Sequence, residues 1–260
     1  MAVKPKHLVL NLLSVAEEPL TSQQFVRVGE LFDITANNIR VTLARLSADK
    51  LIETCGRSQY QLGEHSRELA QNLAGWRSLE KSLVSWSGDW IGVFVATLGR
   101  ADRTALRRRS RVLRLVGFEE FKQGLLVRPN NLEGGVARAR ERLYNLGLER
   151  EAMVFRLGDL EQAEQKAAME LWDTNALEQQ YAEGLREMEN WMVQADKLTP
   201  DVAARETFLI GDRILHHIVF DPLLPTEMID TQARARYIDT MARFDEVGKV
   251  HWRKIYRSLG

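Results

Sequence analysis

The chain has 260 residues, with 36 Lys or Arg, 36 Asp or Glu and a single cysteine, Cys55. One cysteine excludes an intramolecular disulfide framework and a cysteine-based zinc site, which favours a reducing cytoplasm. No stretch approaches the roughly 18 uninterrupted apolar residues of a membrane helix, and the first residues lack a signal-peptide pattern. We therefore expect a cytoplasmic protein of two or three domains with no membrane partner.

Three helices are predicted near the N-terminus, at about residues 7–16, 22–32 and 36–49. Apolar residues recur in them at the three- and four-residue spacing of one buried helix face. Thr21 and Gln24 form a capping-box pattern at the start of the second helix, and Thr35 is the expected cap of the third.

The third of these helices has the composition of a DNA-reading helix. Its inner side carries Ile39, Leu43 and Leu46, and its other side carries mainly polar residues: Asn37, Asn38, Val41, Thr42 and Arg45. Asn can pair with adenine and Arg with guanine in the major groove, so the polar residues are predicted to face base edges. Three further residues are predicted DNA contacts: Arg40, expected to hold phosphate, and Ser22 and Thr35 at the helix starts.

Residues 51–55 and 59–62 alternate like two strands around Gly56, Arg57 and Ser58. Such a hairpin is a wing whose tip, Arg57, can reach a phosphate or the minor groove. Residues 1–63 are therefore predicted to form a winged helix-turn-helix that binds double-stranded DNA. The alternative is a small helical protein-interaction domain whose polar face is only solvated.

Residues 64–84 are predicted to be a helical connector, because their large apolar residues recur at helical spacing. The segments that follow are predicted to alternate between strand and helix: strand 90–98, helix 103–116, strand 124–128, helix 132–146 and strand 153–157. This is the order of a split βαβ, so residues 85–158 are predicted to form a central ferredoxin-like domain of βαββαβ type. The first strand contains no carboxylate, only Asp89 before it and Asp102 after it, which disfavours metal-dependent catalysis.

Residues 159–260 are predicted to form a C-terminal α-helical domain for effector binding and dimerisation, which makes the chain α+β. Helices are expected over residues 159–195, interrupted at Asp173, and over 205–220 and 232–254. An aromatic stripe lines either a ligand pocket or the core: Trp172, Tyr181 and Trp191. His216 and His217 point about 100° apart on a helix, so the pair cannot chelate one metal and no metal site is predicted.

Charge is distributed unevenly along the neutral chain. Residues 100–128 contain nine Lys or Arg against three Asp or Glu, whereas residues 159–201 contain three against eleven. Such asymmetry indicates a polarised molecule. Three arginines align on the outer side of the helix at 103–116: Arg107, Arg111 and Arg114. These arginines have three possible roles: a solvated face, a contact with an acidic partner surface, or a contact with DNA phosphate.

Five features spread over nearly the whole chain resemble PaaX-type transcriptional repressors. They are the winged helix, WSGDW at 86–90, the Arg-rich helix ending in LVGF at 115–118, GLLVRP at 124–129 and FDPLLP at 220–225. The resemblance implies a bacterial repressor of catabolic genes, such as those for phenylacetic acid degradation. It also implies a central domain that resembles a small CRISPR-associated ferredoxin-like nuclease, and a helical C-terminal part.

The resemblance further implies an aryl-acyl coenzyme A thioester as the effector, with phenylacetyl-CoA as the default. One departure from the family pattern follows Met228, where residues 230–233 are Asp-Thr-Gln-Ala instead of an Asp-Trp-Pro-Gly-like continuation. This departure leaves the effector class open. The effector is expected to contact six residues: Arg107, Arg111, Arg114, Trp172, Arg213 and His216.

The predicted function is repression of a catabolic operon, relieved by this small metabolite. A single, nearly neutral winged helix covers little DNA surface, so a homodimer on an inverted-repeat operator is expected. No cofactor and no catalytic residue are predicted. The alternatives are a nucleic-acid phosphodiesterase built on the central domain and a DNA-binding protein without a ligand.

Overall fold

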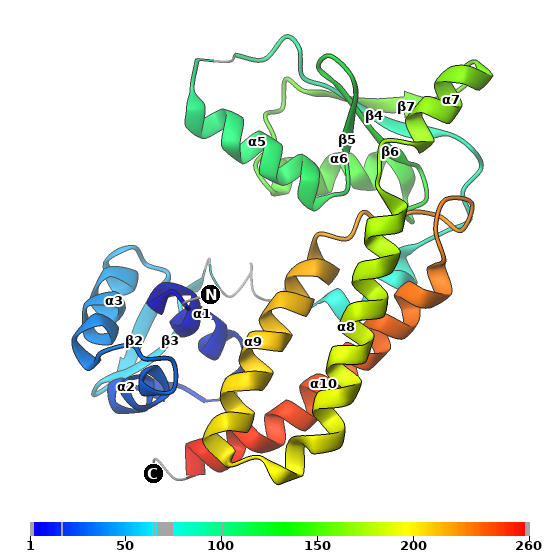
Figure 1. The fold of residues 1–260 in the computed structure, drawn as a ribbon. Coiled ribbons are helices and arrows are strands. Elements are labelled where there is room, and N and C mark those ends of the chain that lie inside the picture. The colour runs from blue at the N-terminus through cyan, green and yellow to red at the C-terminus, as the bar shows by residue number, and fades with distance from the viewer. Residues whose placement is uncertain (1–2, 17, 65, 67–74, 100, 258–260) are drawn as a thin grey trace. The chain divides into compact units, whose positions relative to one another are not determined.

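The computed structural model describes residues 3–16, 18–64, 66, 75–99 and 101–257 (Figure 1). Helices and two antiparallel sheets make it an α+β protein, as the sequence predicted. The chain forms two compact units that do not follow its order. The first unit consists of Met1–Gly75, Glu189–Asp212 and Ala242–Gly260, and the second of Trp76–Met188 and Arg213–Met241.

The N-terminal part of the first unit combines three helices with a three-stranded sheet. Its elements are α1 (Pro5–Val15), β1 (Leu20–Thr21), α2 (Ser22–Glu30), α3 (Ala36–Ala48), β2 (Ile52–Gly56) and β3 (Gln59–Leu62). The sheet order is β1-β3-β2, with Leu20 opposite Tyr60 and Ile52 opposite Leu62. The predicted helices and hairpin are confirmed to within about two residues at their ends, the usual uncertainty of helix boundaries. β1 is too short for an alternation pattern to predict.

Long helices make up most of the C-terminal part. They are α7 (Gln162–Met169), α8 (Thr174–Gln194), α9 (Pro200–Val219) and α10 (Thr231–Arg257), with the short 3-10 helix η3 (Ala195–Lys197) after α8. The interruption predicted at Asp173 is confirmed, since its carboxylate accepts from the N–H of Ala176 in the first turn of α8. α8, α9 and α10 each contribute residues to both units. No helix among the described residues is both long and apolar enough to span a membrane.

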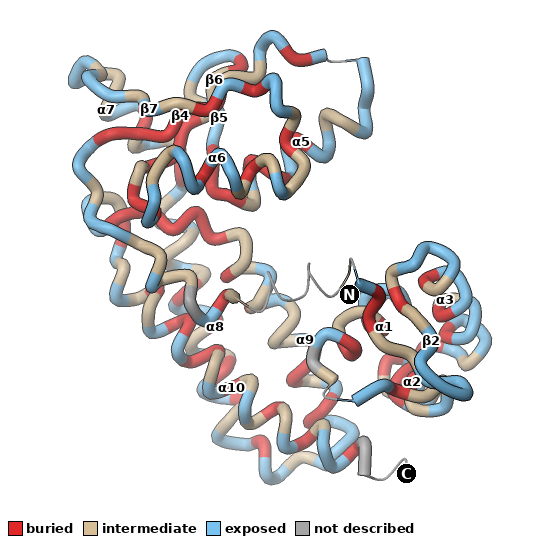
Figure 2. The backbone as a smooth tube through the Cα atoms, turned by 180° about the vertical axis from the view of Figure 1, so that it is seen from behind, coloured by how far each residue is buried: buried red, intermediate tan, exposed pale blue. Residues whose placement is uncertain are grey.

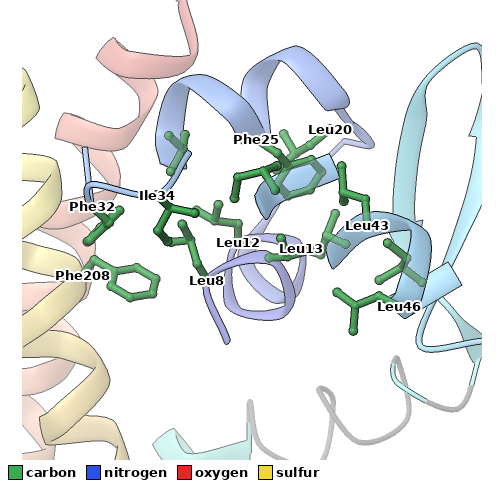
Figure 3. Close-up of a cluster of buried hydrophobic side chains, with 14 of the residues drawn as sticks. Leu8, Leu12, Leu13, Leu20, Phe25, Phe32, Ile34, Leu43, Leu46 and Phe208 are labelled. Carbon is green, nitrogen blue, oxygen red and sulfur yellow. The ribbon is translucent and has the colours of Figure 1, made fainter. Parts of the chain in front are cut away.

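One hydrophobic core joins the N-terminal helices to the C-terminal part of the first unit. Figure 3 shows Leu8 of α1 and Phe25 of α2 in this core, together with Phe208 of α9. The rings of Phe32 and Phe208 meet edge to face, with 5.0 Å between their centroids. Ile255 of α10 belongs to the same core. A boundary at residue 63, as predicted, would divide this core, because periodicity within one helix cannot show which distant helix covers it.

A four-stranded sheet with helices on one face forms much of the second unit (Figure 1). Its elements are β4 (Trp90–Phe94), α5 (Arg103–Leu115), β5 (Glu119–Lys122), β6 (Leu125–Pro129), α6 (Gly135–Asn145) and β7 (Met153–Leu157). Neighbours in the order β5-β6-β4-β7 are all antiparallel. Figure 2 shows buried residues along β4, and Val93 packs there with Leu113 of α5 and Leu143 of α6.

Three details of this sheet differ from the prediction. The first strand was expected to run to Leu98 but ends at Phe94, because the chain turns and the N–H of Leu98 donates to Val95. The helix expected from Leu132 begins only at Gly135, after a glycine with positive φ. β5 was not predicted, since its charged side chains are those of an exposed edge strand rather than of a buried one.

Residues 65 and 67–74 of the predicted helical connector lie outside the described residues. The described end of this segment contains two short 3-10 helices, η1 (Gly75–Ser78) and η2 (Glu80–Ser82). The backbone then runs beside the segment after β6, with Val84 donating to the carbonyl of Asn131 and Glu133 donating to the carbonyl of Ser82.

Buried polar side chains fasten the end of β6 to residues 220–225 in the second unit. The guanidinium of Arg128, which is 1% exposed, donates to the carbonyls of Val116 and Pro222 and to Oδ1 of Asn131. Asn131 donates in turn to the carbonyl of Leu223, at 2.8 Å. Burial lowers the pKa of Arg128 to about 9, so the group stays charged at neutral pH and the carbonyl dipoles replace its lost water. The GLLVRP and FDPLLP segments are therefore two sides of one structural contact.

Candidate nucleic-acid interface

Two capped helices, α2 and α3, position the candidate DNA-reading surface. At the start of α2, the backbone N–H of Gln24 donates to Oγ1 of Thr21 at 3.2 Å, and Oε1 of Gln24 accepts from the N–H of Thr21 at 2.7 Å. This is the predicted capping box. Thr35 caps α3, because its hydroxyl accepts from the N–H of Asn38 at 3.3 Å. Both caps fix where the helices begin.

A short turn holds α3 close against α2. A Cβ at Gly29 would lie 2.8 Å from Cγ1 of Ile39, so a glycine is required at this approach. The chain reverses at Asp33, whose φ of 58° lies in the left-handed region that Asp tolerates better than most residues. The N–H of Ile34 then donates to the carbonyl of Gly29, at 2.9 Å. The turn therefore fixes the angle at which α3 leaves α2.

α3 has one buried face and one exposed face. Ile39, Leu43 and Leu46 are at most 2% exposed. The exposed face carries Asn37, Asn38, Arg40, Val41 and Arg45, with Thr42 half-buried at its edge. Within the described part of the chain, the side chains of these asparagines and arginines form no hydrogen bond or ion pair. Their polar groups are therefore available to a partner.

The hairpin of β2 and β3 is held to the start of α2. Its tip contains Arg57, which is exposed, and Ser58, whose φ is 60°. The backbone N–H of Ser22, the first residue of α2, donates to the carbonyl of Ser58 at 2.9 Å. This bond fixes the backbone of the tip beside α2, while the side chain of Arg57 extends into solvent. Ser22 thus has a structural role next to the predicted contact.

The residues predicted to bind an effector do not form one site. Arg107 and Arg111 are exposed on α5. Arg114 and His216 do share a neighbour, because the ring of Phe220 lies 5.6 Å from Cζ of Arg114 and 4.5 Å from the imidazole centroid of His216. Among the contacts of the described residues, Arg114 is thus the arginine of the stripe on α5 that meets the C-terminal part, through Phe220.

The remaining two predicted residues have partners elsewhere in the second unit. Arg213 forms an ion pair with Glu187 of α8. Trp172 is buried and stacks on Trp90 of β4, with 6.1 Å between ring centroids and 2° between the planes. Helical spacing predicted which side chains share a face, but it could not predict these pairings between elements.

Residues 172–254, which cover α8, α9 and nearly all of α10, match the family model described as the PaaX-like protein C-terminal domain. The chain carries a PaaX-like C-terminal domain. The resemblance inferred from the sequence is thereby confirmed for residues 172–254.

The fold of this chain also occurs in a solved structure. The uncharacterized protein Rv0674 from Mycobacterium tuberculosis is 17% identical, with a TM-score of 0.61, over 97% of this chain and 100% of that one. At this identity the likeness concerns the fold alone. No curated protein matches the chain.

The two carboxylates that flank the first central strand in the sequence, Asp89 and Asp102, both have structural partners. Asp89 accepts from Ser87 and Asn130 and forms an ion pair with Arg156. Burial raises the pKa of Asp89, but these hydrogen bonds and the arginine charge outweigh burial and leave the pKa below its ordinary value. Asp102 caps α5. In the described ranges, no three His, Cys, Asp or Glu residues are grouped so that they could hold a metal ion.

A cavity of about 370 Å³ lies in the second unit, away from all six predicted effector residues. Three segments line it: residues 80–86, residues 224–227 and the first turn of α10, with Asn131 below them. Two of these segments overlap sequence stretches that carried the family resemblance, WSGDW and FDPLLP. Because both stretches carried the family resemblance, the sequence contained a signal that residues from these two segments belong to one site.

Proposed function

We propose that this PaaX-like chain is a sequence-specific DNA-binding repressor of a catabolic operon, acting in the cytoplasm as a homodimer. A small metabolite releases it from its operator. The resemblance to the PaaX type makes an aryl-acyl-CoA the expected metabolite, with phenylacetyl-CoA as the default. The PaaX-like domain at residues 172–254 supports a role in transcription regulation.

The observation that carries the proposal is the exposed face of α3. Asn37 and Asn38 lie near its N-terminal end and Arg45 lies two turns further along, all with unengaged side chains above a buried apolar face. An α-helix fits the major groove of B-DNA, where Asn pairs with adenine and Arg with guanine through two hydrogen bonds each. The face therefore has the chemistry that direct base recognition requires.

The arrangement of elements supports two finer interpretations. We interpret the N-terminal part as a winged helix-turn-helix, supported by the order α1, β1, α2, α3, β2, β3 and by the sheet order β1-β3-β2. We interpret the central sheet as ferredoxin-like, supported by the order β5-β6-β4-β7 with a helix after the first and the third strand.

Two copies of the chain are expected on one operator. The segment from Thr21 to Gly63 carries nearly balanced charge, so it gains little from neutralising phosphates. A dimer doubles the contacts and reads an inverted repeat whose half-sites lie about one helical turn apart, or a multiple of it. Sedimentation of the full chain should give a dimer at micromolar concentration. A monomer with a footprint over one half-site would contradict this part of the proposal.

The test of DNA recognition begins with selection of binding sites from a random duplex library. Asn37→Ala and Asn38→Ala should each lose about 1–3 kcal/mol on the selected duplex and nearly nothing on random DNA, because base contacts specify. Arg57→Ala should weaken binding to both duplexes and reduce the salt slope by about one. Asn145→Ala, which removes an exposed asparagine from the end of α6, is the matched control. Equal losses on both duplexes for the α3 variants would refute the assignment.

Release by a metabolite is tested on the complex with the selected duplex. Phenylacetyl-CoA should lower the affinity for this duplex, while coenzyme A alone should not. Since a ligand shifts an equilibrium only by its differential affinity for the two states, the duplex must weaken ligand binding by the same factor. Unchanged DNA affinity with every acyl-CoA and aromatic acid would leave a DNA-binding protein without an effector.

A further inference from the structure

The cavity in the second unit has a floor that is already fixed in place. Leu224 is fully buried, and its carbonyl accepts from Nη1 of Arg234 at 2.7 Å. Asn131 and Arg234 are each 1% exposed. Asn131 in turn is held by Arg128 and by the carbonyl of Leu223. A ligand entering this cavity would meet ordered groups, so little binding free energy is lost in arranging the site.

The walls of the cavity offer flat and apolar surface. Leu83, Val84, Trp86, Pro225 and Ala235 line it. The indole of Trp86 is fixed by two contacts: its Nε1 donates to the carbonyl of Asp89, and its ring meets that of Trp90 edge to face, 5.1 Å between centroids. A volume of about 370 Å³ falls within the range of small-molecule sites. The walls therefore suit an aryl group or a short acyl chain.

The charge of the cavity limits what else the ligand can carry. Arg234 is the cation among the lining residues, against two carboxylates, Glu80 and Glu227. Its Nε donates to Oε1 of Glu80 at 3.1 Å. Arg234 has five N–H donors, and its two hydrogen bonds to described residues leave others unused. One further acceptor oxygen can bind there, whereas several phosphates would meet uncompensated negative charge.

We propose that this cavity binds the effector through a flat, apolar aryl or acyl group that carries a carbonyl oxygen. The apolar body lies against Trp86 and Pro225, and the oxygen accepts from Arg234. A free carboxylate and a thioester both present such an oxygen, and the adenosine phosphates of a coenzyme A ester stay outside the cavity. This inference rests on the proposed function only in calling the ligand an effector.

The cavity is lined in part by a helix that contributes residues to both units. Thr231 and Arg234, in the first turn of α10, line the cavity. The same helix ends in the first unit, where Ile255 packs in the core that contains Leu8, Phe25 and Ile39. α10 is thus one helix that lines the cavity at its first turn and contributes Ile255 to the core of the first unit at its other end.

Isothermal calorimetry on the full chain without DNA tests the site. The probes are phenylacetate, benzoate, phenylacetyl-CoA and coenzyme A alone. Ala235→Met places a longer side chain into the cavity and should weaken binding of the aryl probes at least tenfold. Ala182→Met, the same change at an exposed position of α8, should leave binding within twofold. Unaltered affinity in Ala235→Met, or no binding of any aryl probe, would overturn the proposal.

The choice of probes separates the two sources of the carbonyl group. Binding of phenylacetate with a similar affinity to phenylacetyl-CoA assigns the cavity to the aryl acid. Much tighter binding of the thioester assigns the cavity to the acyl end of a coenzyme A ester, with its phosphates held outside. Coenzyme A alone competing with phenylacetate would contradict the charge argument and refute the site.

A second variant tests the contact with Arg234 directly and covers the case in which Ala235→Met does not fold. Glu80→Gln removes the carboxylate that pairs with Arg234, so a ligand carboxylate should bind at least threefold more tightly. Phenylacetamide, which is uncharged, should gain much less. Equal changes for the acid and the amide would show that the ligand does not reach Arg234. Loss of DNA binding by any variant in the absence of ligand is a separate result and bears on the proposed function alone.

Discussion

Nε2 of His7 in α1 lies 2.6 Å from Oδ1 of Asp212 in α9, an ion pair that ties the N-terminal helix to the C-terminal part of the first unit. The hydrogen bond to Asp212 raises the pKa of His7 above its ordinary value of 6.5, and this effect outweighs burial, which lowers the pKa. The folded chain therefore holds the imidazolium more tightly than the unfolded chain does.

The ion pair predicts that stability falls as pH rises above about 6.5. Its contribution is complete below the unfolded pKa and is lost as pH rises through the raised, folded pKa. His7→Gln should therefore lower the thermal midpoint at about pH 6 and have little effect at about pH 9. Half of the side chain is exposed, so the contribution is at most about 1 kcal/mol. His216→Gln, which leaves His7 and Asp212 in place, is the control, and a His7→Gln effect independent of pH would contradict the prediction.

Gly117 is predicted to be required by the contact between α5 and the FDPLLP segment. Its φ is 82°, and a Cβ would lie 2.9 Å from both Cα and the carbonyl oxygen of Pro222. Gly117→Ala should destabilise the chain by about 1–3 kcal/mol or more, since strain and overlap add. Gly158→Ala meets nothing within 4 Å and should stay within about 0.5 kcal/mol. Urea unfolding of the two variants gives the comparison, and similar losses would refute it.

The stability of the chain should respond differently to removal of the indole N–H groups of the two stacked tryptophans, Trp90 and Trp172. Nε1 of Trp90 donates to Oε1 of Gln165 at 2.8 Å, whereas the buried Nε1 of Trp172 has no hydrogen-bond partner in the described chain. Phenylalanine removes similar ring volume at each site. Trp90→Phe should therefore lower the free energy of unfolding by about 1–2 kcal/mol more than Trp172→Phe does. The substitution at Trp172 loses no hydrogen bond and removes an unsatisfied donor. Chemical denaturation decides the matter, and a larger cost at Trp172 would show that its N–H is bonded.

Local patterns predicted the elements near the N-terminus well, because each signal there acts over a few residues. The capping box at Thr21 and Gln24 and the cap at Thr35 are both present. Ile39, Leu43 and Leu46 are buried, as their spacing on one helix face required. Such features depend on the geometry of a single helix, which the sequence determines directly.

The surroundings of the predicted effector residues could not be predicted in the same way, because they depend on which elements meet. Arg213 was expected to contact the effector, and in the structure it forms an ion pair with Glu187 of another helix. Trp86 and Arg234 are far apart in the sequence, and both line the cavity together with residues of the FDPLLP segment, which Arg128 of β6 contacts. Periodicity contains no information about such pairings.

Val41 is predicted to contact a thymine methyl group in the operator. It lies at the centre of the exposed face of α3, one turn from Asn37 and one turn from Arg45, and is 40% exposed. A large apolar side chain gains nothing from water at this position, whereas the C5-methyl of thymine presents an apolar surface in the major groove. The neighbouring asparagines favour adenine, so the selected half-site should contain adjacent A·T pairs.

A double-mutant cycle between protein and DNA tests this contact. Val41→Ala should weaken binding to the selected duplex by about 1 kcal/mol, the value of roughly one buried methyl group or slightly more. Replacing the contacted thymine by deoxyuridine removes only the methyl group and should cost the wild-type protein a similar amount. The two losses should not add, because each change removes the same contact. Val250→Ala removes an exposed valine from α10 and serves as the control. Fully additive losses at every thymine of the half-site would mean that Val41 does not touch a thymine methyl group.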